Sequence, residues 1–307
     1  MDFTILTHGF MLKAFLAGLL GGASCGITGV LVVTMRITAI GTCMAHAAFA
    51  GALLGMLLGV DWLPIAFAFS FAAASIIGPV SDRADFAPET VVGIVFTAML
   101  GMAFLFLGMM TGSRTDALNL FWGSILTVKQ VDLVLMGTVC ALLVGGLALF
   151  FKEVRAVLCH RAVALAVGIP ATAIYYVMLL AVGLTVTASL RSIGGLLIYS
   201  LIINPAAAAY QLSYDLKRIF LLSALIGVGS CWAGLMASYW LNVPSGAVIV
   251  LISTLIFCLC TLFSPKKKAL SRKERLEISY SAPVETIETV EIMETGETTP
   301  GSQRKRA

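Results

Sequence analysis

Long runs of apolar residues alternate with short polar stretches along most of the chain. Each run is about 20 residues long, the length that an α-helix needs to cross the hydrocarbon core of a bilayer. Nine such runs can be drawn, at residues 11–34, 38–59, 62–80, 90–110, 131–151, 171–190, 193–212, 219–240 and 245–263. The pattern predicts an all-α, polytopic membrane protein, a helical bundle with eight to nine transmembrane helices.

The run at 193–212 is the least regular of these. It carries two adjacent glycines near its start and the pair Asn204–Pro205 further along. Because proline has no backbone N–H and removes one bond from the helical ladder, we expect this helix to be broken or kinked. Nine full spans and eight spans with one re-entrant segment therefore remain as alternatives.

Charged residues gather outside the apolar runs. Hydrophobic residues make up 59% of the chain, while the stretch 265–307 holds 9 of the 20 Lys and Arg residues and 7 of the 16 Asp and Glu residues. We therefore divide the chain into a transmembrane domain, 1–264, and a tail, 265–307, that is first basic and then rich in Glu and Thr. Low hydrophobicity and many charges are typical of a disordered segment.

The positions of Lys and Arg predict an orientation, because cytoplasmic loops of membrane proteins carry an excess of both. The basic cluster after the last apolar run places the tail in the cytoplasm. Alternating backwards through nine spans then puts 13 Lys and Arg residues inside and 4 outside, with the N-terminus outside. We expect a multi-pass protein of the plasma or inner membrane.

Composition and motifs also exclude several classes of function. The net charge of +4 is small and comes largely from loops and the tail, so it does not indicate nucleic-acid binding. None of the seven cysteines forms a CxxC pair, and most are expected to be small packing residues. The chain has no phosphate loop, HExxH motif or nucleophile elbow, which favours a transport subunit over an enzyme.

One imidazole, that of His46, lies deep inside an apolar run. Polar groups at this depth are costly and usually mark a pathway or a cavity. Helical spacing places Thr42 and Cys43 on the same side of the helix, so the three residues could form part of a metal or proton site. The alternative is that His46 is hydrogen-bonded to a neighbouring helix and only holds the bundle together.

The longest polar stretch between two apolar runs covers residues 151–171. It reads FKEVRAVLCHRAVALAVGIPA, has apolar residues at helical spacing, and ends with a Gly–Ile–Pro stop. In the orientation above it is the longest cytoplasmic loop. It could lie on the membrane surface or dock a cytoplasmic partner.

Several ordered stretches resemble one family, the permease subunits of ABC importers for divalent transition metals of the zinc, manganese and iron type. They are AIGTCMAHAAFAG at 39–51, IGGLLIYSLIINPAAAA at 193–209 and LNVPSGAVIVL at 241–251. The loop at 152–170 also lies where the coupling helix of that family meets its ATPase. The similarity runs in order over residues 10–263 and leaves out the tail.

The resemblance implies a fold similar to the vitamin B12-type importer permease. It further implies a permease homodimer with a central pathway, cytoplasmic ABC ATPase subunits that drive alternating access, and an extracytoplasmic metal-binding protein. The cargo would be a divalent transition metal ion, with no permanently bound cofactor and no nucleic acid.

The family's site residues carry over only in part. The family has an Asp and a His four residues apart as a transient metal site; here the His is His46, but Thr42 takes the place of the Asp. Either Cys43 supplies a softer anionic ligand, which favours zinc, or the site is weakened. Asn204, beside Pro205, either lines the pathway or bonds a neighbouring helix. The residues placed at the ATPase contact are Arg155, His160, Arg161 and Gly168.

Two other functions remain open. The loss of the carboxylate at Thr42 leaves room for a permease of the same architecture that carries a metal chelate. An ion-coupled secondary carrier is the alternative from another class, but such carriers usually show internal repeats and charges embedded in the membrane. The chain shows no convincing internal repeat, and His46 is the one ionisable group well inside an apolar run. The importer permease is therefore favoured.

Overall fold

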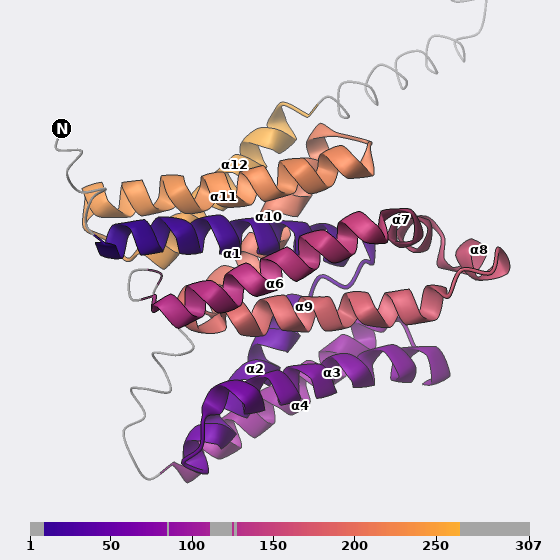
Figure 1. The fold of residues 1–307 in the computed structure, drawn as a ribbon, viewed down its shortest axis with the longest axis horizontal. Coiled ribbons are helices and arrows are strands. Elements are labelled where there is room, and N and C mark those ends of the chain that lie inside the picture. The colour runs from indigo at the N-terminus through magenta and orange to yellow at the C-terminus, as the bar shows by residue number, and fades with distance from the viewer. Residues whose placement is uncertain (1–8, 85, 111–124, 126–127, 265–307) are drawn as a thin grey trace, which may run out of the picture. The chain divides into compact units, whose positions relative to one another are not determined.

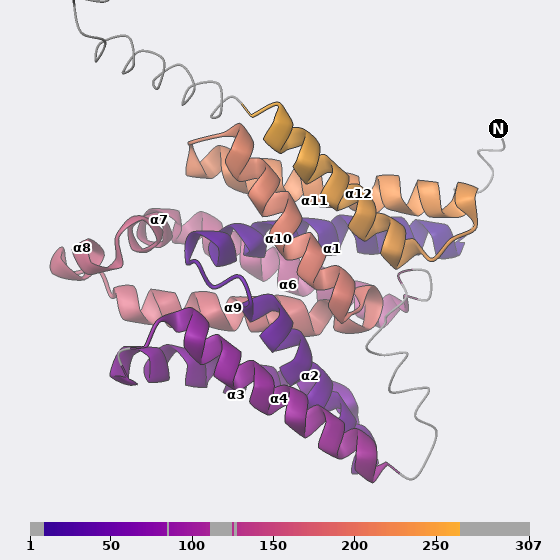
Figure 2. The same cartoon turned by 180° about the vertical axis from the view of Figure 1, so that it is seen from behind.

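The computed structural model describes residues 9–84, 86–110, 125 and 128–264. Within these residues the chain forms helices and no strands. The helices shown in Figures 1 and 2 are α1 (Gly9–Thr34), α2 (Ile40–Leu57), α3 (Trp62–Ala84), α4 (Pro88–Met109), α6 (Gln130–Leu149), α7 (Phe151–Cys159), α8 (Arg161–Ala166), α9 (Ala171–Ile193), α10 (Gly195–Leu212), α11 (Leu216–Leu241) and α12 (Ser245–Leu262).

Eight of these helices are long and apolar enough to cross a membrane, which confirms the predicted polytopic bundle. They are α1, α2, α3, α4, α6, α9, α11 and α12. Helix α10, whose shorter apolar part is Leu197–Leu212, corresponds to the irregular run at 193–212. An all-helical bundle follows from solvent, because backbone polar groups in lipid must be satisfied within each segment.

The sequence predicts a broken or kinked helix at 193–212, and the predicted break at Pro205 is wrong. Helix α10 is continuous from Gly195 to Leu212 with Pro205 inside it. The chain leaves helical geometry instead at Gly194, whose φ of 90° is accessible to glycine and strained for other residues. A single missing hydrogen bond does not break α10, because the helix packs against α1, α11 and α12, which hold it in place.

Small residues bring the helix backbones close together. A Cβ atom on Gly22 of α1 would lie 2.8 Å from the backbone of Gly227 in α11. Likewise, a Cβ on Gly51 of α2 would lie 2.6 Å from the carbonyl oxygen of Ile65 in α3. The Gly-rich composition of these runs therefore serves helix–helix packing, as in other membrane bundles.

The two short helices α7 and α8 lie together at one end of the bundle (Figures 1 and 2). We call this the α7–α8 end. A pocket of about 290 Å³ at this end is lined by the end of α1, the start of α4, residues 157–161 and the start of α9. A second pocket is lined in part by Lys152 of α7 and by Lys217 at the start of α11. Several polar segments, far apart in sequence, thus meet here.

Candidate functional site

His46 lies in the second turn of α2 and is half-buried. Its Nδ1 atom is 2.9 Å from the backbone oxygen of Thr42. Its ring meets Phe96 of α4 edge-on, with centroids 5.0 Å apart and an interplanar angle of 87°. Because a carbonyl oxygen only accepts, Nδ1 carries the proton in this bond, and in the neutral ring Nε2 carries the lone pair that can bind a metal.

The two residues predicted beside His46 lie in different environments. Thr42 is half-buried and uses its backbone oxygen to orient the imidazole, while Cys43 is fully buried among apolar residues. Among the residues that the structure describes, no group of three His, Cys, Asp or Glu side chains could hold a metal ion. Within this part of the chain, α2 therefore offers a partial ligand set centred on His46.

A carboxylate that sequence reasoning missed closes the start of α2. Glu89, in the first turn of α4, accepts hydrogen bonds through Oε1 from the backbone N–H of Ala39 at 3.2 Å and from the Thr38 hydroxyl at 3.4 Å. Its Oε2 is buried and has no hydrogen-bond partner. The position of Glu89 after Pro88 signals only the start of α4. Its contact with α2 comes from packing.

Asn204 belongs to a polar cluster between α10 and α12. Its Nδ2 lies 3.1 Å from the Ser200 hydroxyl, 2.9 Å from that of Ser253 and 3.0 Å from that of Thr254. Asn204 thus makes the contact with a neighbouring helix that was one of its two predicted roles. Pro205 is buried behind it in α10. Ser253 and Thr254 gave no signal in the sequence, since isolated hydroxyls are common in apolar helices.

The residues predicted at the ATPase contact lie at the α7–α8 end. Arg155 on α7 and His160 between α7 and α8 are exposed. Gly168 is also exposed and has a φ of 90°, which ends the turn after α8. The apolar side chains of Val163, Leu165 and Val167 are exposed as well. This part of the chain combines basic and apolar groups on one accessible segment.

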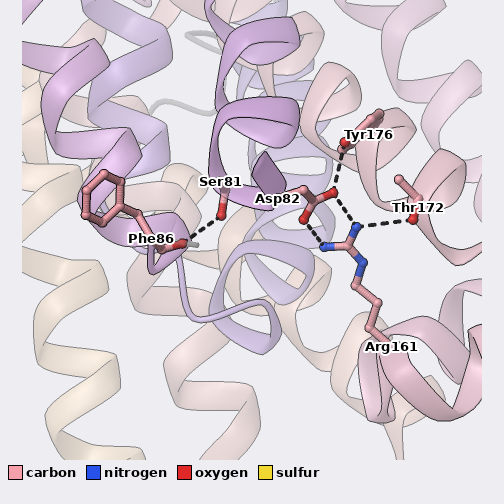
Figure 3. Close-up of polar contacts among 6 residues, drawn as sticks. All are labelled: Ser81, Asp82, Phe86, Arg161, Thr172 and Tyr176. Atoms are coloured by element: carbon pink, nitrogen blue, oxygen red, sulfur yellow. Dashed lines mark hydrogen bonds and ion pairs between the residues drawn. The ribbon is translucent and has the colours of Figure 1, made fainter. Parts of the chain in front are cut away.

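Arg161 behaves differently from these neighbours, because its side chain turns back onto the bundle (Figure 3). Its Nη1 and Nη2 donate to the two carboxylate oxygens of Asp82 in α3 at 2.9 and 2.7 Å. Nη2 also lies 3.3 Å from the Thr172 hydroxyl, and the Tyr176 hydroxyl donates to Asp82 at 2.9 Å. The guanidinium stacks over the ring of Tyr175, 4.6 Å from its centroid.

The electrostatics of this contact follow from the pairing. The hydrogen bond to Asp82 raises the pKa of the Arg161 guanidinium above its ordinary value, so the guanidinium stays charged. Sequence reasoning did not select Asp82. Its position at the end of an apolar run, beside Arg83, is typical of an interfacial residue and does not reveal a partner 79 residues away.

Relatives of known role match nearly the whole described chain. The manganese transport system membrane protein MntC of Listeria innocua is 28% identical over 88% of this chain and 96% of its own length. MntC of Halalkalibacterium halodurans is 29% identical, over 87% of this chain and 92% of its own length. The manganese import system permease protein ScaB of Streptococcus gordonii is 28% identical over 86% of this chain and 95% of its own length.

Solved structures agree with these relatives. A chain of PsaBC from Streptococcus pneumoniae in complex with Fab superposes with a TM-score of 0.78 and 27% identity, over 88% of this chain and 97% of that one. A metal-chelate type ABC transporter in an inward-facing conformation shares the fold at a TM-score of 0.68 and 15% identity, over 82% of this chain and 85% of that one. The second likeness concerns the fold alone.

A family match covers the same region. Residues 7–264 match the ABC 3 transport family, and this range includes every helix described above. Together with the manganese permeases, this match confirms the resemblance to permease subunits of divalent-metal ABC importers that the three sequence stretches indicated. The chain is a multi-pass membrane protein, and it belongs to the ABC 3 transport family.

Proposed function

We propose that this chain is the permease subunit of an ATP-driven importer that carries a divalent transition metal, manganese before zinc or iron, into the cytoplasm. The observation that carries the proposal is the match, over almost all of the membrane part, to permeases named for manganese transport and import. A permease has no need of its own ATPase motif, because hydrolysis takes place on separate cytoplasmic subunits.

His46 is the residue proposed to contact the metal. The carbonyl of Thr42 orients its ring, so that Nε2 is the lone-pair nitrogen. Neutral imidazole suits Fe²⁺ and Zn²⁺, whereas Mn²⁺ prefers oxygen ligands. The preference for manganese therefore rests on the named relatives and not on the chemistry of His46. The family resemblance implies a carboxylate at position 42, where this chain has Thr42. Because Cys43 is buried among apolar residues, we infer that its thiolate does not replace that carboxylate, which removes one argument for zinc. The resulting site is weak, and a weak site allows release on the cytoplasmic side.

The proposed working unit is a homodimer with the pathway between two copies. Each copy would contribute its own His46, and so the partial ligand set of one chain would be doubled by symmetry. Alternating access would then move the two copies, or helices within them, so that the pair of imidazoles faces first the outside and then the cytoplasm.

We place the α7–α8 end in the cytoplasm. The positive-inside rule supports this orientation, because Arg155 and Arg161 lie there with Lys152 and Lys217. The exposed apolar residues of α8 and the residues after it would dock the ATPase subunit. A metal-binding protein would deliver the cargo at the opposite end, and the tail 265–307, which lies outside the described residues, would be cytoplasmic.

The test is uptake of manganese, zinc and iron by cells that carry the chain together with its ATPase subunit and its metal-binding protein. His46→Ala is expected to reduce uptake of the preferred metal at least about tenfold at normal expression. Thr42→Asp is expected to tighten metal binding. Cys43→Ser should leave metal preference unchanged, with Cys25→Ser, another buried cysteine, as the matched control.

Two outcomes would overturn the proposal in different ways. If His46→Ala transports as well as the parent, the imidazole is not on the pathway. If the parent takes up none of the three ions, the free-ion cargo is wrong. The permease for a metal chelate would then become the leading alternative.

A further inference from the structure

The ion pair between Asp82 and Arg161 has a geometry that distinguishes it from ordinary surface pairs. Exposed pairs between flexible side chains contribute little. Here the contact is bidentate, the two side chains are 32% and 30% exposed, and Tyr176 adds a third hydrogen bond to the same carboxylate. We call Asp82, Arg161 and Tyr176 the clamp (Figure 3). Bidentate charged contacts fix orientation as well as distance.

The clamp ties a short, loosely connected helix to the bundle. Helix α8 has six residues and lies between two non-helical joints, His160 on one side and Gly168 on the other. A Cβ on Gly168 would meet nothing within 4 Å, so that joint is unpacked. Besides the buried side chain of Ala164 and the packing of α8 on α7 and α9, the polar contacts of Arg161 hold α8 against the bundle. The clamp is the part of these contacts that reaches α3.

The other partner in the clamp connects α8 to the helix that carries His46. Asp82 is in the last turn of α3, and α3 packs along α2 with almost no space between the backbones. Added Cβ atoms on Gly51 and Gly55 of α2 would each lie 2.6 Å from the α3 backbone, at Ile65 and Trp62 respectively. Two helices in such close contact move together, because packed interiors do not compress.

We propose that Asp82 and Arg161 are positioning residues that transmit a displacement of α8 to the α3–α2 pair, so that coupling of ATP hydrolysis to the state of the pathway at His46 depends on the clamp. This inference rests on the proposed function for its source of motion, the ATPase docked at α8. It assigns Arg161 an internal role, in place of a direct contact with the ATPase.

The first experiment measures metal transported per ATP hydrolysed, with the chain and its ATPase subunit reconstituted in proteoliposomes. Asp82→Asn and Arg161→Gln should each lower this ratio about fivefold or more, the usual lower range of a coupling effect, while binding of the ATPase subunit stays intact. The charge-swapped double variant, Asp82→Arg with Arg161→Asp, should recover at least about a third of the parent ratio.

The control is a second acidic–basic pair at the start of α11. Arg218 lies 4.0 Å from Asp215 with its side chain 79% exposed, and no bidentate geometry. Arg218→Gln should leave the ratio unchanged. The inference would be overturned if Asp82→Asn and Arg161→Gln both transport as much metal per ATP as the parent. It would also be overturned if the charge-swapped double variant transports no more metal per ATP than the worse of these two single variants.

A second readout does not depend on the cargo. With the other accessible cysteines replaced, His46→Cys is labelled by a water-soluble maleimide, with and without ATP, in complexes that keep their ATPase. The labelling rate should respond to ATP in the parent background and lose this response with Arg161→Gln, although hydrolysis continues. An unchanged response would refute the clamp. If no metal is imported by the parent, the metal proposal fails, but this labelling result still decides the inference.

Discussion

Helix α2 and the short helix α8 are held in place by opposite means. Around α2 the contacts are apolar and very close. Its one imidazole is hydrogen-bonded to the backbone of its own helix and packs perpendicular to the Phe96 ring. Helix α8 has few buried side chains and is fixed by charged hydrogen bonds to α3. The position of α2, which carries His46, therefore depends on shape, and the position of α8 depends on charge.

The difference follows from the two solvents. In the membrane interior, charged groups are expensive, so small residues and close packing provide specificity. At the aqueous end, a short helix has too little apolar surface to hold itself, and a geometrically precise ion pair provides the orientation. In the coupling that we propose, a displacement of α8 would pass first through a polar contact with α3 and then through backbone packing between α3 and α2.

The largest effect is expected from breaking the packing side of this comparison. Gly51→Ala puts a methyl group 2.6 Å from the Ile65 carbonyl oxygen and 2.9 Å from Cα of Ala66, so the helices must separate. We expect a loss of about 1–3 kcal/mol of stability, visible as a lower thermal unfolding midpoint in detergent. Gly101→Ala on α4, where nothing lies within 4 Å, is the control and should be neutral or stabilising.

Removal of the clamp should have a somewhat smaller effect on stability. Asp82→Ala deletes three hydrogen bonds and leaves the Arg161 guanidinium, whose Nε is buried without a partner, more poorly satisfied. We expect a loss of about 1–2 kcal/mol. The loss should shrink at high salt, which screens a partly exposed pair. A stability difference between Asp82→Ala and the parent that does not change with salt would contradict the electrostatic interpretation.

The cap on α2 tests whether the shape-dependent helix also needs one polar contact. Glu89→Ala removes the acceptor for the Ala39 N–H, and loss of a hydrogen bond of this kind costs about 1 kcal/mol. Hydrogen exchange at the first amides of α2 should accelerate accordingly. Glu153→Ala, in the first turn of α7, serves as the control and should leave those amides unchanged.

The smallest effect is expected at the α10–α12 contact. Asn204→Ala removes the hydrogen bonds to Ser253 and Thr254, and interhelical hydrogen bonds in membranes average about 0.6 kcal/mol. A double-mutant cycle with Ser253→Ala measures the coupling directly. A coupling several times larger would place this cluster beside the clamp as a functional contact rather than a modest packing aid.

Much of the architecture was determined by the sequence alone. Each apolar run corresponds to a helix, and the polar stretch at 151–171 became α7, α8 and the start of α9. The place of His46 inside one of these long apolar helices also follows from the sequence. These features are local, because a segment in lipid must satisfy its own backbone hydrogen bonds and therefore becomes a helix wherever it is long and apolar enough.

Only the tertiary structure decided which side chains meet. Arg161 pairs with Asp82 across 79 positions, Glu89 caps a helix 50 positions earlier, and Asn204 reaches α12. The helix is interrupted at Gly194 and not at Pro205 for the same reason, because neighbouring helices pack around the proline. Hydropathy fixes where helices form, but the partner of a polar group depends on how distant helices pack, and no local pattern encodes that arrangement.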